Sequence, residues 1–595
     1  MSTRTTADLI IDRLRAWEVD RVYGYAGDGN NPLLGAFRRA AEGPEFIAAR
    51  HEEGAAFMAV GEAKYGHGVG VVTSTQGPGA VHLLNGLYDA KLDSAPVVAL
   101  VAQQHRSVLG SGYQQEIDLQ NLFADVSSPF VQSVVAPEQL PMVLDRAFRS
   151  ALSTRKPAVI ILPHDVQQAE APDLGQSHGE VVTAPRWTSG TVTPRSEDLD
   201  RAVQVLAQGE KIALLVGQGI RQAQDEVAEL AERLGAGITT SLLGKPYVDE
   251  THPLAAGTMG HLGTPASAQV LQECDTLLIV GSNDPWTEFY PAPGQARAVQ
   301  IDLDPAMIGN RYPIEVGLVG HAGPSIRALL ERLPERGAGP WRSEVEQAVQ
   351  RGREIARLRA AVPAKPLNPE LVVRGLSERI PGNAQLAVDV GSSVYHYVRQ
   401  LTLPAGVPAH LSSTLASMGC GVPYAVAAKE VAPERPVVAL VGDGAMEMLG
   451  INELITVAAR WRTWENPRLI LVVLNNRDLA EVSWEQRESE SEPRFDASQT
   501  VPGFDFAAYA GQLGLHGMVL QDDTALDRVL DEAFSVERPV VVDVRADPDV
   551  PLLPPFPHGE QMLAGMREGL RAEGEAGRHG LELLERYAEI EAQRS

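Results

Sequence analysis

The sequence predicts an α/β protein with three doubly wound parallel-sheet domains followed by a helical tail. The first observation behind this fold class is a repeated alternation of short apolar runs, such as residues 69–73 and 95–102, with helix-like stretches. Continuous apolar runs bounded by Gly and Pro are typical of parallel strands buried on both faces. The second observation is the length of 595 residues, which corresponds to about three to four domains at roughly 150 residues each.

Segments rich in Pro, Gly and polar residues divide the chain into blocks. Residues 167–193 have this composition and are expected to form a linker. A charged helix is expected between 336–340 and the proline-rich stretch 361–369. The expected domains are residues 1–175, 190–345, 365–550 and, as a C-terminal tail, 551–595.

The composition narrows the class of protein. The formal net charge is −26, and this acidic balance argues against nucleic-acid binding because the electrostatic term would oppose it. The two cysteines, Cys274 and Cys420, lie far apart and give neither a disulfide framework nor a zinc spacing. Residues 1–17 read as an amphipathic helix rather than a signal peptide, and no apolar run approaches the ~20 residues of a membrane span. These features predict a cytoplasmic enzyme without a membrane span.

One strand–helix–strand unit in the third block carries the strongest chemical signal. The apolar run 437–441 leads directly into Gly442-Asp443-Gly444, and a helix-like stretch follows. A second apolar run, 469–474, ends in Asn475-Asn476. Because open α/β sheets bind ligands at the carboxyl ends of their strands, Asp443 and Asn476 are expected to meet at one edge.

Asp443, Asn476 and the backbone carbonyl of Asp478 form an all-oxygen ligand set, which suits Mg²⁺ or Ca²⁺. Such an ion neutralises a diphosphate, while Gly442 and Gly444 let the backbone approach the phosphates and the following helix N-terminus favours the anion. Residues 27–31 spell the same letters, Gly-Asp-Gly-Asn-Asn, with no intervening unit to place two ligands around one ion. We interpret that segment as a strand-end loop lining the site.

The unit from Gly442 to Asn476 resembles the thiamine-diphosphate motif of the family that contains pyruvate oxidase, acetolactate synthase and 2-oxoacid decarboxylase. Residues 50–56 (RHEEGAA) are similar to the catalytic-glutamate segment of that family, and residues 76–79 with Asn85 and Gly86 to the turn that follows it. Residues 418–421 resemble the segment whose apolar side chain supports the cofactor. The pyruvate oxidase and pyruvate:quinone oxidoreductase branch is the most similar, on residues 50–53, 110–113 and 300–305.

The resemblance implies a pyrimidine-binding first domain, a central Rossmann-like domain and a diphosphate-binding third domain. It also implies that Glu52 is the catalytic carboxylate, which hydrogen-bonds the pyrimidine ring of the cofactor. The first domain of one subunit would face the third domain of another within a homotetramer, built as a dimer of dimers. The residues implied to contact thiamine diphosphate are Gly391, Met418, Gly442, Gly444, Ala445 and Asn476, and those implied to bind magnesium are Asp443, Asn476 and Asp478.

The central block also suggests a flavin. The run 212–216 is followed by Gly217 and Gly219, which alone is weak evidence for a dinucleotide site. An acidic residue, Asp302, follows the run 298–301 and is placed to accept a ribose or adenine hydrogen bond. Resemblance to the pyruvate oxidase branch implies FAD, with contacts from Gly217, Gly219, Met259, Gly260, His261, Leu262, Ser282, Asn283 and Asp302.

The substrate pocket departs from the pyruvate oxidase pattern. Gln115 and Glu485 match that branch and are implied to be catalytic, with Asp28 nearby in the pocket. Gln114 and Glu481 replace two Phe residues that surround the substrate methyl group in the pyruvate oxidases. Because unpaired polar groups around a methyl are unfavourable, we expect a 2-oxo acid with a neutral polar or small side chain and weak activity on pyruvate.

The leading hypothesis is oxidative decarboxylation of a 2-oxo acid, with electrons passing through FAD to oxygen or a quinone. A flavin-bearing carboligase of the acetolactate synthase type and a non-oxidative decarboxylase stay open as alternatives. The tail 560–595 holds eight Glu and five Arg, whereas a membrane-binding helix usually has a basic polar face. It is therefore expected to pack within the protein, with peripheral membrane contact left open.

Overall fold

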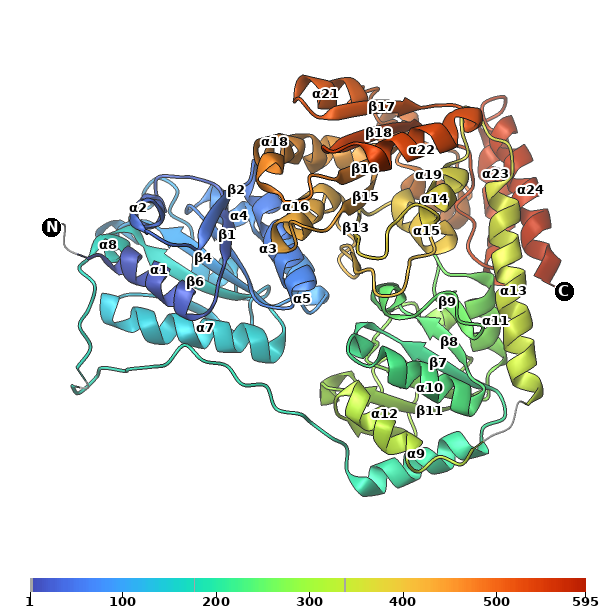
Figure 1. The fold of residues 1–595 in the computed structure, drawn as a ribbon, viewed down its shortest axis with the longest axis horizontal. Helices are drawn as coiled ribbons and strands as arrows, with labels where there is room; N and C mark the ends of the chain where they lie inside the picture. Colours follow the sequence, from blue (N-terminus) through green and yellow to red (C-terminus); the bar gives the residue numbers. More distant parts are fainter. Residues whose placement is uncertain (1–3, 176, 336–338, 595) are drawn as a thin grey trace.

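The computed structural model describes residues 4–175, 177–335 and 339–594 and confirms the expected fold class. Three six-stranded sheets follow one another along the chain, every strand pairing in them is parallel, and helices flank each sheet (Figure 1). All seven residues of β4 (Val97–Gln103) and of β16 (Leu469–Asn475) are buried. Apolar runs rather than alternating patterns therefore mark the strands, because both faces of each sheet are covered.

The first sheet has the strand order β2-β1-β3-β4-β6-β5. Its remaining strands are β1 (Arg21–Gly24), β2 (Glu45–Ala48), β3 (Gly70–Ser74), β5 (Val131–Ser133) and β6 (Ala158–Pro163). Its helices are α1 (Thr6–Ala16), α2 (Asn31–Arg39), α3 (Glu52–Gly66), α4 (Pro78–His82), α5 (Leu84–Leu92), α6 (Leu119–Leu122), α7 (Leu140–Thr154) and α8 (His164–Gln168).

The third sheet repeats this topology, with the order β14-β13-β15-β16-β18-β17. Its remaining strands are β13 (Gln385–Val388), β14 (Ala409–His410), β15 (Val437–Gly442), β17 (His516–Leu520) and β18 (Val540–Arg545). Its helices are α14 (Pro369–Ser377), α15 (Ser392–Gln400), α16 (Gly421–Val431), α17 (Asp443–Ala445), α18 (Ile451–Arg460), α19 (Ala480–Glu490), α20 (Asp496–Gln499), α21 (Phe506–Gln512) and α22 (Leu526–Ser535).

The central sheet is arranged differently, in the order β12-β11-β10-β7-β8-β9. Counted from its own first strand, this is the 3-2-1-4-5-6 order of dinucleotide-binding domains, with the switch point between β7 and β10. The strands are β7 (Ile212–Val216), β8 (Gly237–Thr240), β9 (Ala255–Thr258), β10 (Thr276–Val280), β11 (Arg297–Asp302) and β12 (Val316–Val319). The helices are α9 (Ser196–Gln208), α10 (Gln224–Leu234), α11 (Pro265–Glu273) and α12 (Ala322–Leu330).

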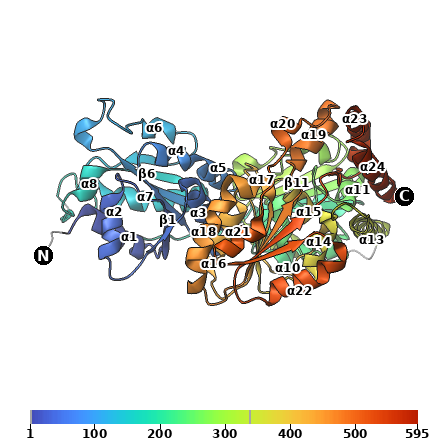
Figure 2. The ribbon, with the colours of Figure 1, turned by 90° about the horizontal axis from the view of Figure 1, so that it is seen from above.

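The first and third domains share one hydrophobic core, whereas the central domain has its own. Helix α3 packs against α16, with the rings of Phe57 and Tyr424 6.3 Å apart. Gly61 lies at the crossing, where an added Cβ would come within 2.7 Å of Ala427 Cβ, so the close approach of the two helices depends on this glycine. Figure 2 shows α3, α16 and α18 side by side between the two sheets.

The connecting segments follow the expected pattern. The linker begins after α8, which ends at Gln168, and leads to α9 (Figure 1). Its described residues form no helix or strand, apart from an isolated bridge between Glu170 and Thr5. The charged helix expected between the central and third domains is α13 (Pro340–Ala360). The tail forms α23 (His558–Ala572) and α24 (Arg578–Glu591), which pack on α19 and α13. Within the described part of the chain, no helix is long and apolar enough to cross a bilayer.

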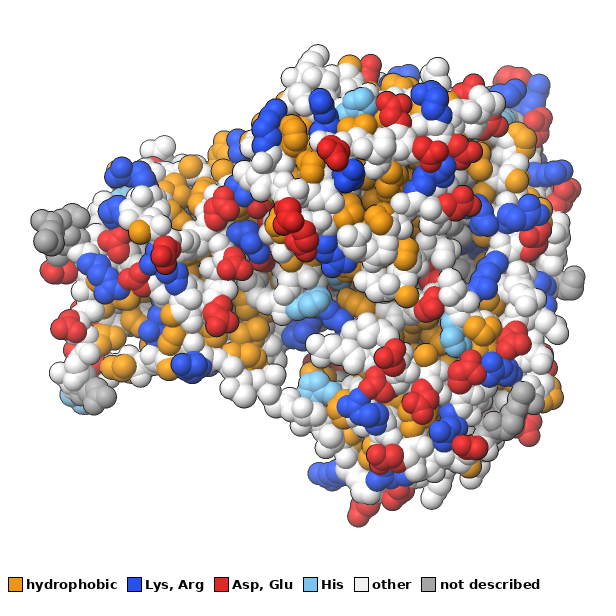
Figure 3. Space-filling view, in the orientation of Figure 1, with side chains coloured by type: hydrophobic (Ala, Val, Ile, Leu, Met, Phe, Trp, Pro, Cys, Tyr) orange, Lys and Arg blue, Asp and Glu red, His pale blue; other side chains and the backbone are white. Residues whose placement is uncertain are grey.

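Acidic and basic side chains are interspersed over the face of the molecule in Figure 3, so the net negative charge does not form a single patch there. A notch in the outline separates the first domain from the central domain (Figure 3).

Candidate active site

The two halves of the metal motif lie at the ends of neighbouring strands. β15 pairs with β16 in register from Val437 opposite Leu469 to Gly442 opposite Leu474, so Asp443 and Asn476 leave the sheet at the same edge. The backbone N–H of Arg477 donates to Asp443 Oδ2 over 2.6 Å, which ties the Asn476 loop to Asp443. A π-helical turn, Met446–Gly450, then joins α17 to α18, a distortion that is frequent at functional sites.

Asp443 is a buried carboxylate without a cationic partner. Its exposed fraction is 3%, and burial raises its pKa to about 7 even though the N–H groups of Arg477 and Gly444 lower it. A hard divalent cation would relieve this desolvation cost. An added Cβ at Gly442 would have no atom within 4 Å, which leaves room beside the carboxylate. The oxygens of Asp443, Asn476 and Asp478 therefore fit Mg²⁺ together with a diphosphate.

A second carboxylate, Asp389, organises the residues expected under the cofactor. It follows β13 and accepts hydrogen bonds from the backbone N–H groups of Val390, Gly419 and Gly421, each over 2.8 Å. Burial raises its pKa to about 6, although these three donors lower it. The sequence interpretation missed this residue, although an acidic residue directly after a buried strand was an available signal.

The residues expected to contact thiamine diphosphate gather around this turn. Met418 lies beside Gly444. A Cβ added to Gly444 would come within 3.2 Å of Met418 Cε. Gly391 has φ of 107°, in the region that favours glycine, and open space around it. Ala445 is buried at the end of α17. These residues and the metal ligands form one continuous region at the edge of the third sheet.

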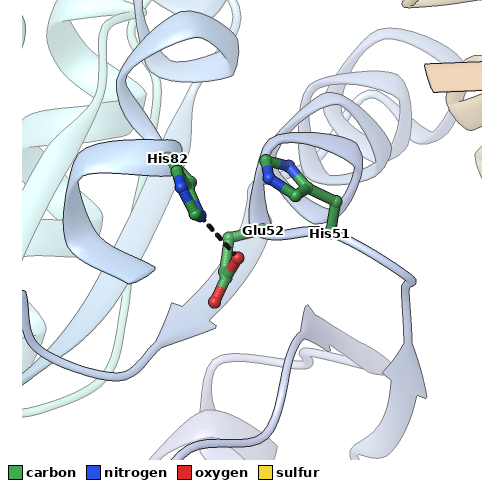
Figure 4. A group of neighbouring side chains, drawn as sticks. All are labelled: His51, Glu52 and His82. Atoms are coloured by element: carbon green, nitrogen blue, oxygen red, sulfur yellow. Dashed lines mark hydrogen bonds and ion pairs between the residues drawn. The ribbon is translucent and has the colours of Figure 1, made fainter. Parts of the chain in front are cut away.

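Glu52 begins α3 in the first domain and is 7% exposed. His82 Nδ1 lies 2.9 Å from Glu52 Oε2, and the His82 ring lies 4.4 Å from that of His51 (Figure 4). An added Cβ at Gly79, in the first turn of α4, would come within 3.1 Å of Glu52 Oε1, so a glycine there leaves room for the carboxylate. His82 was missed by sequence reasoning, because its contact with Glu52 joins two different helices.

The loop that repeats the metal-motif letters is a turn after β1, as expected from the sequence. Its Asp28 accepts from Gln76 Nε2 over 3.2 Å, and Gln76 Nε2 also donates to Gln115 Oε1 over 2.9 Å. Asn30 closes the loop locally by accepting from the N–H of Gly27. Asp28 and Gln115, both expected in the pocket, are thus joined through Gln76.

Gln114 and Glu481 are not joined in the described chain. Gln114 is exposed in the first domain, and its carbonyl accepts from Gln104 Nε2 over 2.8 Å. Glu481 and Glu485 lie on α19 in the third domain, next to the metal-motif loop. Burial raises the pKa of Glu481 to about 8, with a further contribution from Glu485.

The central domain presents small and unpartnered polar groups at its switch point. An added Cβ at Gly217 would come within 2.3 Å of Gly281 O, and one at Gly219 within 2.5 Å of Gly281 Cα, so only glycines fit there. Ser282 Oγ and Asn283 Nδ2 are buried without a hydrogen-bond partner. Buried polar atoms without partners require an explanation, and the position of these two after β10, at the switch point, is where open α/β sheets bind ligands.

The other expected flavin contacts border the same region. Gly260 has φ of 93°, and an added Cβ would come within 2.9 Å of the Trp286 ring. The His261 ring stacks on Trp286 at 5.7 Å. Met259 is buried and Leu262 packs against the third domain. Asp302 ends β11, and burial raises the pKa of its carboxyl.

Glu52 and the metal motif occupy opposite sides of the domain junction without direct contact. Among the described residues, no hydrogen bond or ion pair joins Glu52 to Asp443 or Asn476. The hydrogen bonds across the junction include those from the Arg50 N–H to Glu453 Oε1, over 3.0 Å, and from Asn85 Nδ2 to Ser417 Oγ, over 2.7 Å.

Comparison with known proteins decides the family. Models of the thiamine pyrophosphate enzymes match in three places: the N-terminal TPP binding domain at residues 4–122, the central domain at 199–329 and the C-terminal TPP binding domain at 389–544. The chain belongs to the thiamine pyrophosphate enzyme family. Glu52 falls within the first match, and both Asp443 and Asn476 fall within the third.

Several thiamine pyrophosphate enzymes are similar over nearly the whole chain. A protein of Bacillus subtilis, YdaP, named as thiamine pyrophosphate-containing, is 33% identical over 94% of this chain and 95% of its own length. The acetolactate synthase of Arthrospira platensis is 31% identical over 92% and 94%. The pyruvate oxidase of Lactiplantibacillus plantarum is 29% identical over 91% and 89%. The protein is thus a member of the thiamine-dependent enzymes that act on 2-oxo acids.

Proposed function

We propose that this enzyme oxidatively decarboxylates a 2-oxo acid, with electrons passing to FAD and then to oxygen or a quinone. The observation that carries the oxidative step is the switch point of the central sheet. There Gly217, Gly219 and Gly281 allow close approach of a ligand, and Ser282 and Asn283 offer buried hydrogen-bonding atoms without partners. The strand order of this sheet supports a dinucleotide rather than a purely structural domain.

The third domain would hold the reactive cofactor. Asp443 and Asn476, with the carbonyl of Asp478, would bind Mg²⁺ and through it the diphosphate, while Gly391 and Met418 would border the rest of the molecule. When bound, thiamine diphosphate supplies the carbon nucleophile and the electron sink for decarboxylation. The protein positions the reacting groups and excludes water around them.

Glu52 would share a proton with the pyrimidine ring of the cofactor through a hydrogen bond. His82 engages Oε2 of Glu52, which leaves Oε1, beside Gly79, to face the cofactor. A carboxyl fixed in this way has one oxygen committed to the protein and one to the ligand. His82 would therefore act as a positioning residue for Glu52.

We further propose that each active site combines two chains. In the described part of its own chain, Glu52 forms no hydrogen bond or ion pair with Asp443 or Asn476, so a second subunit would bring its third domain to Glu52. Two such sites would form per dimer, and two dimers would form a homotetramer of closed symmetry.

An anaerobic titration tests the proposed activity. A purified enzyme loaded with Mg²⁺ and thiamine diphosphate should show a flavin spectrum, and a 2-oxo acid should bleach it while releasing CO₂. A protein without bound flavin, active in decarboxylation, would instead be a non-oxidative decarboxylase.

A carboligase is the second candidate, because acetolactate synthases are among the similar proteins at 30–31% identity. In that case the flavin would stay oxidised under the same conditions, and the product would contain the carbon skeletons of two substrates. Product analysis by NMR separates the two outcomes.

A further inference from the structure

Helix α19 presents three carboxylates on one face. Glu481, Glu485 and Glu488 follow one another at spacings of four and three residues, which align on one side of a helix. The helix starts two residues after Asp478 and so adjoins the metal-motif loop. Sequence reasoning included Glu481 and Glu485 but missed Glu488.

This acidic face is only partly open to solvent, because Glu485 is exposed whereas Glu481 and Glu488 are partly buried. Glu481 Oε2 is fully buried and has no hydrogen-bond partner, and the Glu488 side chain is 5% exposed. Burial raises the pKa of Glu488 to about 8, with further contributions from Glu485 and Glu481. The opposite flank of α19 is covered by α23, where an added Cβ on Gly565 would come within 2.7 Å of Glu488 O.

No Lys or Arg of the described ranges forms an ion pair with Glu481, Glu485 or Glu488. Arg487, on the same helix, points away and pairs with Glu573, and Arg494 pairs with Asp478. Among the described residues, the only basic group near the three carboxylates is His261, whose Nε2 lies 3.5 Å from Glu488 Oε2. Burial lowers the pKa of His261, so this ring is a weak source of positive charge.

The three carboxylates are spread along the helix and do not gather around one point. The His, Cys, Asp and Glu groups of the described chain whose ligand atoms converge do not include these three residues. An elongated cation could instead follow the row of carboxylates. Aromatic rings complete such a site, because Trp286, 41% exposed and stacked on His261, offers a face for a cation–π contact.

We propose that the acidic face of α19, with His261 and Trp286, binds the positively charged end of the substrate, a 2-oxo acid with an amino or guanidino group on its side chain. This inference rests on the proposed function and replaces the expectation of a neutral side chain, which considered Gln114 and Glu481 without Glu488. The substrate carboxylate and keto group would lie toward the Asp478 end of the helix, where the reacting part of the cofactor is expected, and the cation would extend toward Glu488.

The test compares pairs of 2-oxo acids that differ only in charge. One member of each pair has a guanidino end and the other a ureido end of the same length, in a series of chain lengths. We expect kcat/KM for CO₂ release to favour the guanidino member by about 10-fold or more, as charged hydrogen bonds in a buried site allow. Glu481→Gln and Glu488→Gln should each remove most of this preference.

Glu490→Gln is the matched control. Glu490 lies on the same helix, is exposed and points away from the acidic face, so the same loss of one charge should leave the preference unchanged. The inference is overturned if ureido acids are used as well as guanidino acids, or if Glu490→Gln changes the preference as much as Glu488→Gln.

A binding measurement separates this inference from the proposed function. The matching 2-hydroxy acids cannot be decarboxylated, and their Kd for the holoenzyme is measured by calorimetry. Tighter binding of the guanidino compound, lost in Glu488→Gln, supports the inference even if no 2-oxo acid releases CO₂, an outcome that would reject the proposed function alone. Equal Kd values for the two compounds would overturn the inference independently of any turnover.

Discussion

The first and third domains have the same strand order but contribute opposite halves of the chemistry. In the third domain, the Gly-Asp-Gly turn follows β15 and the Asn pair follows the adjacent β16, so Asp443 and Asn476 leave the sheet at the same edge from two loops. In the first domain, the same five letters fall in one loop after β1, where Asn30 closes a local turn and Asp28 pairs with Gln76. The same residue types therefore predict a metal site only where adjacent strands place them at one sheet edge.

The two domains also differ in the carboxylates that they bury. Asp443 is buried without a cation, which suits a metal ligand, whereas Glu52 is held by a histidine, which suits a proton-handling group. Under the proposed function, the same sheet edge would be used once for a cation and once for a proton. Four predictions test this difference between the two domains.

The largest effect is expected from Asp443→Ala. Loss of even an outer-shell partner lowers metal affinity by about 10–100-fold, so loss of a direct ligand should weaken thiamine diphosphate binding by roughly 100-fold or more. Asp28→Ala, the equivalent letter in the first domain, should leave cofactor affinity close to that of the natural protein. Calorimetric titration at fixed Mg²⁺, with circular dichroism to check folding, measures both. Equal losses in the two variants would contradict the assignment.

Glu52→Gln should keep metal and cofactor but slow proton exchange at the reactive carbon of the cofactor by about 10²–10⁴-fold, the usual range for a catalytic acid–base group. Hydrogen–deuterium exchange followed by NMR gives this rate directly. Glu53→Gln is the control, because Glu53 neighbours Glu52 but pairs with Asn85. An unchanged exchange rate in Glu52→Gln rejects the role of this residue.

His82→Gln should have a smaller effect, of about 10-fold on the same rate, because Gln can still donate a hydrogen bond to Glu52 Oε2 but cannot titrate. The pH dependence of the exchange rate is the decisive readout. It should shift in His82→Gln and stay unchanged in a His105→Gln control, since His105 lies in an exposed loop away from Glu52. If both variants keep the natural pH profile, His82 has only a structural role.

The smallest effect concerns stability. The folded-state pKa of Glu481 is raised to about 8 from the usual 4.5, so its neutral form is favoured in the folded protein. Below about pH 4.5, Glu481 is neutral in both the folded and the unfolded protein and does not change the free energy of unfolding. Between about pH 4.5 and 8 it ionises in the unfolded chain first, so the free energy of unfolding falls as the pH rises, until the group is ionised in both states. Glu481→Gln should therefore raise Tm by a few degrees above pH 8 and leave it unchanged near pH 4.5. The natural protein and the Glu481→Gln variant both contain the neighbouring groups Glu485, Glu488 and His261. A difference in Tm that does not depend on pH would therefore show that it does not come from the ionisation of Glu481.

Local patterns predicted much of the fold and of the metal motif. The expected runs 437–441 and 469–474 correspond to β15 and β16, because buried parallel strands are continuous apolar segments. Glu52 came from resemblance alone, since one Glu at a helix start carries no distinctive pattern. The structure added His82, Asp389 and Glu488, whose partners are distant in sequence: Glu52 lies 30 residues from His82, and Gly421 lies 32 residues from Asp389. Only the helix and sheet packing brings these side chains together.

The central claim is that one active site combines the first domain of one chain with the third domain of another. It is tested most directly by mixing two inactive variants, Glu52→Gln and Asp443→Ala, after dissociation and reassembly. With equal amounts of the two variants, half of all dimers would contain one chain of each, and one of the two sites in each such dimer would have both residues intact. The account predicts recovery of about a quarter of the natural activity. Formation of mixed dimers without any recovered activity would contradict it, because Glu52 and Asp443 would then act within a single chain.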